Sequence, residues 1–282
     1  MTRRTLAAEI AIEGLALHAG GTVHMVLAPA ASGAGVVFRR SDLGIDIPAL
    51  YDHVGETRLG TVIGDKGASV GVIEHLMAAV AGAGIDDLVV ILDGPEPPIL
   101  AGDALSYLVL LEKAGLRDTG GARDAIVVKR RVEVASGEAR AALVPDELCV
   151  FDFEISFPSV VIGEQSLLWQ FSEAAFRRDI APARTFGFVH ELDALTKAGL
   201  ARGASLENTL AIDGDTLVNP ELRRFPDEFV RHKILDALGD LALAGSPIVG
   251  RFEGRRSGHA LNNALLRALF ADPENYERTA VL

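Results

Sequence analysis

The order of predicted elements constrains the fold most, because it occurs twice, once on each side of a short polar stretch. Residues 118–123 read Asp-Thr-Gly-Gly-Ala-Arg, and we interpret this glycine-containing run as a linker. On each side of it, strand-like patterns come first and helix-like patterns follow. A chain of 282 residues is long enough for two such units. We therefore predict an α+β fold of two similar domains, 1–120 and 125–282, each a β-sheet packed on helices.

The first half has loosely alternating and β-branched runs that predict strands. These predicted strands cover residues 5–17, 22–27, 35–39 and 87–92. Apolar residues at helical spacing predict a helix at 70–83, with Ser69 as its N-cap and Gly84 at its end. A second helix is expected at 104–114, where Gly115 stops it.

The second half follows the same plan. Its predicted strands cover residues 125–134, 139–144 and 148–156. Its predicted helices cover residues 172–176, 189–198, 227–244 and 260–270. The two halves are alike in this order of elements and not in residue identity.

Charge and cysteine content exclude several classes of protein. A net charge of −12 argues against nucleic-acid binding, which needs a clustered positive surface. The single cysteine, Cys149, rules out an internal disulfide and a thiolate-rich zinc site, and a buried structural thiol is expected. Glu9 and Glu13 interrupt the apolar N-terminal stretch, so no signal peptide is expected, and no run reaches the length of a membrane span. We expect a soluble, cytoplasmic, monomeric protein.

A polar stripe lies on the predicted helix at 227–244. His232, Asp236 and Asp240 are four residues apart, so they share one helix face that is surrounded by apolar residues. A histidine and an aspartate at this spacing can bind one metal ion. The alternative is a structural His–Asp hydrogen bond. The apolar surroundings favour the wall of a cleft over open surface.

Two further histidines stand in unusual surroundings. Glu74 and His75 lie side by side on an apolar helix, where burial would cost free energy unless each group has a partner. The alternative is the solvent edge of an amphipathic helix. His259 follows Gly258 at a helix entry, and a plain entry turn would not require a histidine.

Together these residues provide what a catalytic zinc site requires. Three N or O ligands leave one position for water, a carboxylate accepts its proton, and a separate acid serves the leaving group. His75, His232 and Asp236 are the expected ligands, and Glu74 is the expected base. Such a ligand set would also accept Fe²⁺.

Six motifs resemble the UDP-3-O-acyl-N-acetylglucosamine deacetylase family. They are G-L-A-L-H-A-G at 14–20, V-I-E-H-L-M-A-A at 72–79, G-P-E-P-P-I at 94–99, A-R-T-F-G-F at 183–188, F-P-D-E-F-V-R-H-K-I-L-D-A-L-G-D at 225–240 and S-G-H-A-L-N-N at 257–263. They occur in the family's order and span nearly the whole chain. The resemblance implies an active site between the two helical layers and zinc-dependent removal of the N-acetyl group from an acylated UDP-sugar in lipid A biosynthesis.

The resemblance also implies roles for individual residues. His259 would be a cation facing the oxyanion or the leaving amine, with Asp240 as its partner, and the Thr185 hydroxyl would polarise the amide carbonyl. The residues expected to contact the substrate are Phe186, Lys233, Lys129 and Gly258. The expected partner is a small nucleotide sugar, acylated or not.

Some positions depart from the family pattern. Ala101 stands where an acidic residue is usual, which leaves Asp103 as the nearest carboxylate. Arg202 and Ala204 stand in a stretch that usually helps to form the acyl passage. A deacetylase acting on another N-acyl sugar is therefore the alternative. A non-catalytic relative would have a broken ligand set, a metalloprotease would need H-E-x-x-H, and a phosphoryl-transfer enzyme would need a P-loop.

Overall fold

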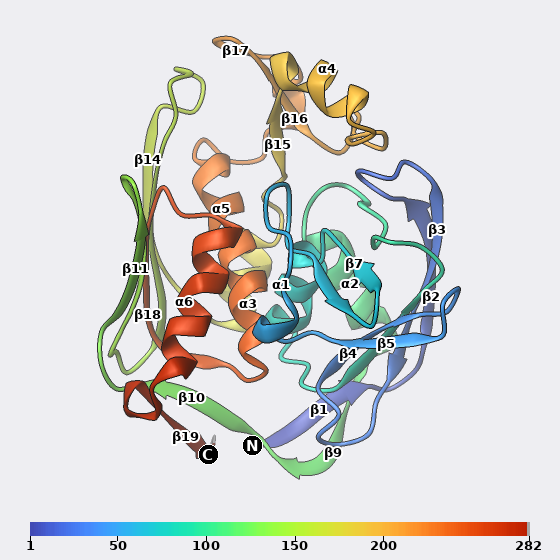
Figure 1. The fold of residues 1–282 in the computed structure, drawn as a ribbon, viewed down its shortest axis with the longest axis vertical. Coiled ribbons are helices and arrows are strands. Elements are labelled where there is room, and N and C mark those ends of the chain that lie inside the picture. Colours follow the sequence, from blue (N-terminus) through green and yellow to red (C-terminus); the bar gives the residue numbers. More distant parts are fainter. Residues whose placement is uncertain (281–282) are drawn as a thin grey trace.

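Two β-sheets face each other across a layer of helices in the computed structural model, which describes residues 1–280 (Figure 1). Helices α1 and α2 lie against the first sheet, and α5 and α6 lie against the second. The predicted α+β class is confirmed. The proposed domain boundaries at 120 and 125 stay a prediction.

The first sheet has five strands in the order β2-β3-β8-β4-β5. Their bounds are β2 Ile10–Leu15, β3 Thr22–Pro29, β4 Val36–Arg40, β5 Ile45–Pro48 and β8 Leu88–Leu92. Val90 of β8 pairs with Leu27 on one side and Phe38 on the other. All three side chains are fully buried, because paired residues point to the same face of a sheet.

The second sheet has seven strands, with β18 at its centre. Their bounds are β10 Asp124–Val128, β11 Val132–Ser136, β12 Ala139–Val144, β13 Cys149–Ser156, β14 Glu164–Gln170, β18 Ile248–Arg255 and β19 Tyr276–Ala280. The sequence patterns did not predict β14, β18 or β19. In β18 the buried positions include Gly250 and Gly254, and a Cβ on Gly254 would lie 2.8 Å from the Phe252 ring. These two glycines hide the alternation of large apolar residues that marks a strand.

Each half is closed by pairing between its first and last strands. β1 (Thr2–Leu6) pairs with β9 (Leu116–Ala122), and β10 pairs with β19, both antiparallel. The interpretation of residues 118–123 as a linker is wrong in local structure, because most of this stretch belongs to β9. Its glycines are tolerated in a strand because the strand is largely exposed at the edge of a two-stranded ribbon.

The helices match the predictions except at one start. Their bounds are α1 Glu74–Gly82, α2 Leu105–Ala114, α3 Glu173–Ala175, α4 Val189–Lys197, α5 Glu228–Leu241 and α6 His259–Ala271. Ser69 does not cap α1, because residues 68–70 are extended: β7 (Ala68–Val70) pairs with β6 (Ile63–Asp65). A π-helical segment, η2 (Phe176–Ile180), follows α3. None of the described helices is long and apolar enough to cross a membrane.

A small separate unit projects at the top of Figure 1. It contains α4 and a three-stranded sheet in the order β15-β16-β17. The strands are β15 Phe186–Phe188, β16 Leu210–Asp213 and β17 Thr216–Leu217. Four short 3-10 helices complete the described chain: η1 Tyr51–His53, η3 Pro220–Leu222, η4 Ala242–Ala244 and η5 Pro273–Asn275. β15 begins one residue after Thr185, so this unit is anchored beside the predicted site.

Candidate active site

The predicted ligands meet where α1 packs on α5. A Cβ on Gly239 of α5 would lie 2.0 Å from the carbonyl oxygen of Glu74, so only a glycine permits this approach. The close contact places His75 of α1 opposite His232 and Asp236 of α5. Two elements that are far apart in the sequence therefore combine their polar side chains at one buried point.

The three predicted ligands form a compact group. Their candidate ligand atoms, one from each of His75, His232 and Asp236, all lie within 4.8 Å of one another. Asp236 Oδ1 is 3.3 Å from His232 Nε2 and 3.7 Å from His75 Nε2. All three side chains are buried. It is the one such group of metal-ligating residues among residues 1–280.

The protonation of the two imidazoles suits metal binding. His232 Nδ1–H donates to the carbonyl of Ala183 at 3.1 Å, which leaves Nε2 with a free lone pair. Burial and the neighbouring His232 lower the pKa of His75 to about 3, and burial also lowers the pKa of His232. The buried Nδ1 of His75 has no hydrogen-bond partner among the described residues. Two neutral imidazoles beside a carboxylate fit a divalent cation.

Asp236 is held as a carboxylate. Burial alone would raise its pKa, but His232 and Lys233 together hold the pKa well below its usual range. Lys233 Nζ donates to Asp236 Oδ2 at 2.6 Å, while Oδ1 faces the histidines. The lysine therefore orients the carboxylate with Oδ1 toward the two histidines.

Glu74 lies next to this group and is nearly completely buried. Burial raises the pKa of Glu74 to about 7, although the nearby His259 opposes the shift. The Thr61 backbone N–H donates to Glu74 Oε2 at 3.0 Å. Gly60 has a φ of +144°, and a Cβ there would lie 2.8 Å from Glu74 Oε1. A carboxylate with a pKa near neutrality is suited to accept a proton.

His259 forms a charged pair with Asp240. Burial would lower the pKa of His259, but Asp240 and Glu74 outweigh it and raise the pKa to about 9. His259 Nδ1–H donates to Asp240 Oδ2 at 2.9 Å, and Nε2 lies 3.9 Å from Glu74 Oε1. Asn262 and Thr61 also donate to Asp240, at 2.8 and 2.5 Å. Asp240 is therefore a satisfied buried anion that keeps His259 protonated.

A cavity of about 590 Å³ opens over these residues. Nine of the predicted site residues line it: Glu74, His75, Thr185, Phe186, His232, Lys233, Asp236, Gly258 and His259. Asp240 lies behind His259. The structure does not bring Lys129 to this cavity, because its ammonium pairs with Glu277 of β19 at 3.3 Å.

The departures from the family pattern, Ala101, Arg202 and Ala204, lie outside the lining of this cavity. Asp103 accepts hydrogen bonds from Ser106 at the start of α2 and from Arg224. Arg202 packs its side chain against Gly20 and Gly199. Neither residue contacts the predicted ligands in these interactions.

Sequence reasoning missed two residues that organise the site. Thr61 links Glu74 to Asp240 through its backbone N–H and its hydroxyl. It lies in a loop without periodicity, so no pattern marked it. Glu228, one helical turn before His232, has a fully buried carboxylate. A charged residue on the His232 face of α5 was the available signal.

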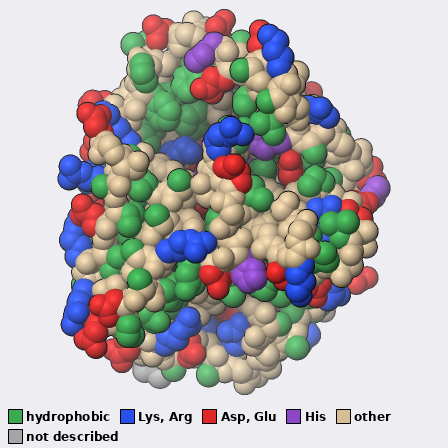
Figure 2. Space-filling view, viewed as in Figure 1, with side chains coloured by type: hydrophobic (Ala, Val, Ile, Leu, Met, Phe, Trp, Pro, Cys, Tyr) green, Lys and Arg blue, Asp and Glu red, His purple; other side chains and the backbone are tan. Residues whose placement is uncertain are grey.

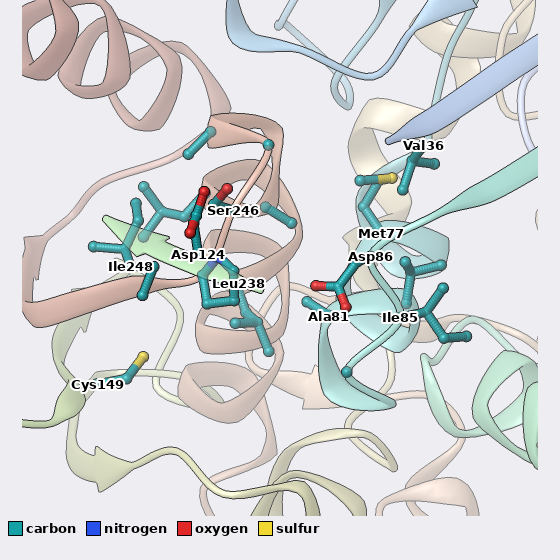
Figure 3. Close-up of a pocket in the computed structure, with 18 of the residues that line it drawn as sticks. Val36, Met77, Ala81, Ile85, Asp86, Asp124, Cys149, Leu238, Ser246 and Ile248 are labelled. Atoms are coloured by element: carbon teal, nitrogen blue, oxygen red, sulfur yellow. The ribbon is translucent and has the colours of Figure 1, made fainter. Parts of the chain in front are cut away.

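A second cavity, of about 570 Å³, lies between the two sheets and is lined by the C-terminal parts of α1 and α5. Figure 3 shows Met77, Ala81 and Ile85 on one wall and Leu238 and Ile248 on the other. No group of three metal-ligating side chains lines it within residues 1–280. It therefore lacks the chemistry of the first cavity.

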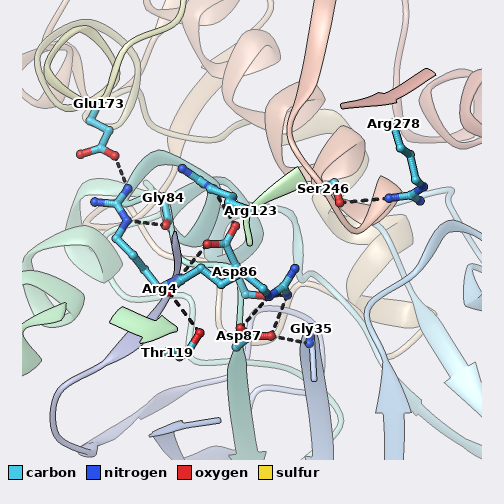
Figure 4. Close-up of polar contacts among 11 residues, drawn as sticks. Arg4, Gly35, Gly84, Asp86, Asp87, Thr119, Arg123, Glu173, Ser246 and Arg278 are labelled. Carbon is cyan, nitrogen blue, oxygen red and sulfur yellow. Dashed lines mark hydrogen bonds and ion pairs between the residues drawn. The ribbon is translucent and has the colours of Figure 1, made fainter. Parts of the chain in front are cut away.

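Four of the charged residues that line the second cavity, Arg3, Asp86, Arg123 and Glu173, form ion pairs (Figure 4). Arg123 Nε donates to Asp86 Oδ1 at 2.8 Å, and Arg3 Nη2 donates to Asp87 Oδ1 at 2.7 Å. Arg4 pairs with Glu173. These ion pairs connect β1, β9 and β10 to the loop before β8 and to α3, so they have a structural role.

The surface charges are interspersed. Figure 2 shows basic and acidic side chains mixed over one face of the molecule, without a continuous basic surface. Two arginines of the basic run at 129–131 pair with carboxylates: Arg130 with Glu274, and Arg131 with Glu133 and Glu253. This run is therefore a solvated, paired surface.

Comparison with known proteins identifies the family. A family model described as UDP-3-O-acyl N-acetylglycosamine deacetylase matches residues 3–271. The chain belongs to this family. The matched residues include all those that line the 590 Å³ cavity.

Individual relatives in the UDP-3-O-acyl N-acetylglycosamine deacetylase family agree along nearly their full length. The chain is 49% identical over 278 residues to UDP-3-O-acyl-N-acetylglucosamine deacetylase of Phenylobacterium zucineum, covering 97% of this chain and 95% of the relative. It is 44% identical over 277 residues to the protein of the same name from Myxococcus xanthus, covering 98% and 88%. The resemblance read from the sequence motifs is confirmed.

Proposed function

We propose that this chain hydrolyses the N-acetyl group of UDP-3-O-acyl-N-acetylglucosamine with a bound zinc ion, in lipid A biosynthesis. The family match and the names of the relatives support the reaction and the substrate class. The observation on which the proposal chiefly rests is the buried group of His75, His232 and Asp236 beside Glu74.

His75, His232 and Asp236 would hold the metal. When bound, zinc supplies Lewis acidity, which polarises the amide carbonyl and lowers the pKa of a water molecule. Two imidazoles and one carboxylate would also hold Fe²⁺, so the choice of metal belongs to the proposal. Lys233 keeps the Asp236 carboxylate ionised and oriented for this role.

Two titratable groups handle the protons. Glu74, with its raised pKa, accepts the proton of the attacking water. His259, held protonated by Asp240, faces the same cavity and stabilises the oxyanion. Either His259 or Glu74 then protonates the leaving nitrogen. The products are acetate and the free amine of the sugar.

The remaining lining residues would position the substrate. Thr185 lines the cavity, and its hydroxyl would donate to the developing oxyanion. Phe186, whose ring centroid is 6.2 Å from that of His232, would contact the sugar or nucleotide. Lys233 and the backbone at Gly258 would contact polar substrate groups. Lys129 is left out because its ammonium is paired with Glu277.

The test is acetate release from UDP-3-O-acyl-N-acetylglucosamine by zinc-loaded wild type and Glu74→Gln. Loss of a general base should lower kcat by about 10²- to 10⁴-fold. The matched control is Glu96→Gln, because Glu96 is also a buried carboxylate but accepts only the His18 and Ala19 amides, outside the cavity. It should retain activity.

A second substrate, UDP-N-acetylglucosamine without the 3-O-acyl chain, separates the alternatives. Turnover of the acylated substrate alone supports the proposal. Turnover of the non-acylated sugar alone would keep the mechanism and reject the substrate in favour of another N-acyl sugar. Equal turnover by wild type and Glu74→Gln would reject the role of Glu74.

A further inference from the structure

The carboxylate of Glu228 is fully buried near the start of α5. It accepts three backbone hydrogen bonds: from Arg184 N to Oε1 at 3.0 Å, from Phe225 N to Oε2 at 3.1 Å, and from Arg224 N. A buried carboxylate is expensive unless such donors compensate it. Glu228 does not line the 590 Å³ cavity, so it cannot contact the substrate there.

One of these three amides has a second role in the site. The Arg184 N–H and the Ala183 carbonyl belong to the same peptide unit. The N–H donates to Glu228, and the carbonyl accepts from His232 Nδ1–H at 3.1 Å. Glu228 and His232 are one turn apart on α5, so one helix face holds this peptide from both sides. Rotation of the peptide would break both hydrogen bonds.

The hydrogen bond from the Arg184 N–H to Glu228 also has an electronic effect on the Ala183–Arg184 peptide. A charge-assisted hydrogen bond to the peptide N–H polarises the peptide and makes its carbonyl a stronger acceptor. A stronger acceptor holds the Nδ1–H tautomer of His232 and increases the basicity of Nε2. Groups that hold the second nitrogen of a ligating histidine commonly affect metal affinity in this way.

We propose that Glu228 is a positioning residue that acts on His232 through the Ala183–Arg184 peptide. It fixes the tautomer and the ring orientation of His232 without touching the metal position. The same segment leads directly to Thr185. The two hydrogen bonds that hold the Ala183–Arg184 peptide therefore also set where the Thr185 hydroxyl enters the cavity. This inference rests on the proposed function, in which His232 is a metal ligand.

The test variant is Glu228→Gln, which keeps the size of the side chain. Three amide donors share two carboxylate oxygens, so a glutamine must turn its NH₂ group toward at least one donor. The matched control is Asp103→Asn, because Asp103 is also a buried carboxylate and bonds to Arg224 of the same loop, but not to the Ala183–Arg184 peptide. Thermal unfolding measures how far each variant is destabilised.

Two readouts do not depend on activity. Zinc affinity, measured by competition with a chelator, should fall about 10- to 100-fold in Glu228→Gln and stay near the wild-type value in Asp103→Asn. Nitrogen-15 NMR of the metal-free protein at pH 8 should show His232 as the single Nδ1–H tautomer in wild type and Asp103→Asn. In Glu228→Gln it should show a mixture of tautomers.

The outcomes separate the two levels of the proposal. Wild-type protein that binds no zinc would reject the proposed function itself. If wild type binds zinc, an unchanged zinc affinity and an unchanged His232 tautomer in Glu228→Gln would overturn the role of Glu228. Equal loss of zinc affinity in both variants at equal thermal destabilisation would also overturn it, because the effect would then follow from loosening of the loop.

Discussion

Replacing Gly239 with alanine should harm the site more than the fold. A Cβ at this position would lie 2.0 Å from the Glu74 carbonyl oxygen and 2.8 Å from its carbon. An unstrained carbon–oxygen contact is roughly 3.3 Å, so α1 and α5 must separate by roughly 1.3 Å. The separation moves His75 away from His232 and Asp236, because the ligands come from both helices.

The magnitudes for stability and for function differ. Overpacking costs about 1–3 kcal/mol, and the better helix propensity of alanine offsets about 0.8–1 kcal/mol of it. The free energy of unfolding should therefore fall by no more than about 2 kcal/mol. A misplacement of roughly 1 Å among reacting groups costs about 100-fold in rate, so kcat/KM should fall by about that factor.

The assay combines thermal unfolding, zinc affinity and acetate release for Gly239→Ala. The control is Gly21→Ala, because no heavy atom lies within 4 Å of a Cβ at Gly21. The control should match wild type in all three measurements. Wild-type zinc affinity and kcat/KM in Gly239→Ala would refute the argument that this contact sets the ligand geometry.

Four further predictions rest on the hydrogen bonds and pKa shifts. The pKa of His259 is raised to about 9, so kcat/KM should fall as pH rises through about 9, and His259→Gln should lack this limb in a pH–rate profile. Because folding raises the pKa of His259, the protonated side chain stabilises the fold fully below about pH 6.5. This stabilisation is lost as pH rises through about 9. The unfolding free energies of wild type and His259→Gln should therefore converge over this pH range. Thr61→Val removes the 2.5 Å hydrogen bond to Asp240 and should cost about 1.5–3 kcal/mol in chemical denaturation, and an unchanged midpoint would contradict it. Burial raises the pKa of Cys149 to about 12, so its reaction with a disulfide reagent at pH 8 should be about 10³-fold slower than in denaturant.

The sequence was most informative where a regular period links residues. The four-residue spacing of His232, Asp236 and Asp240 predicted one helix face, and α5 places all three side chains at buried positions. The adjacent Glu74 and His75 were equally visible because they interrupt an apolar helix. For these residues, helical geometry alone connects sequence to position.

The parts that could not be predicted depend on contacts across the chain. Thr61 bonds to Asp240, 179 residues away, and no local pattern encodes that distance. From the sequence alone, Gly239 is only a residue of low helix propensity inside a helix. In the structure it permits the close approach of α1 to α5. The strand β18 was missed because Gly250 and Gly254 occupy two of its inward positions. The Phe252 and Phe153 rings fill the space beside Gly254, and the Val128 side chain fills the space beside Gly250. The role of Lys129, drawn from resemblance, finds no support in its position.

The pairing of first with last strands in each half has a consequence for how the chain can be divided. β1 pairs with β9, and β10 pairs with β19. A cut at Arg123 would therefore leave the first and last strands of each fragment paired with each other. The fragments would meet mainly through the α1–α5 contact. His75 and Glu74 would then come from one fragment, and His232, Asp236 and His259 from the other. Separately produced halves would be expected to complement each other in trans, with the metal ion acting as a bridge that draws them together.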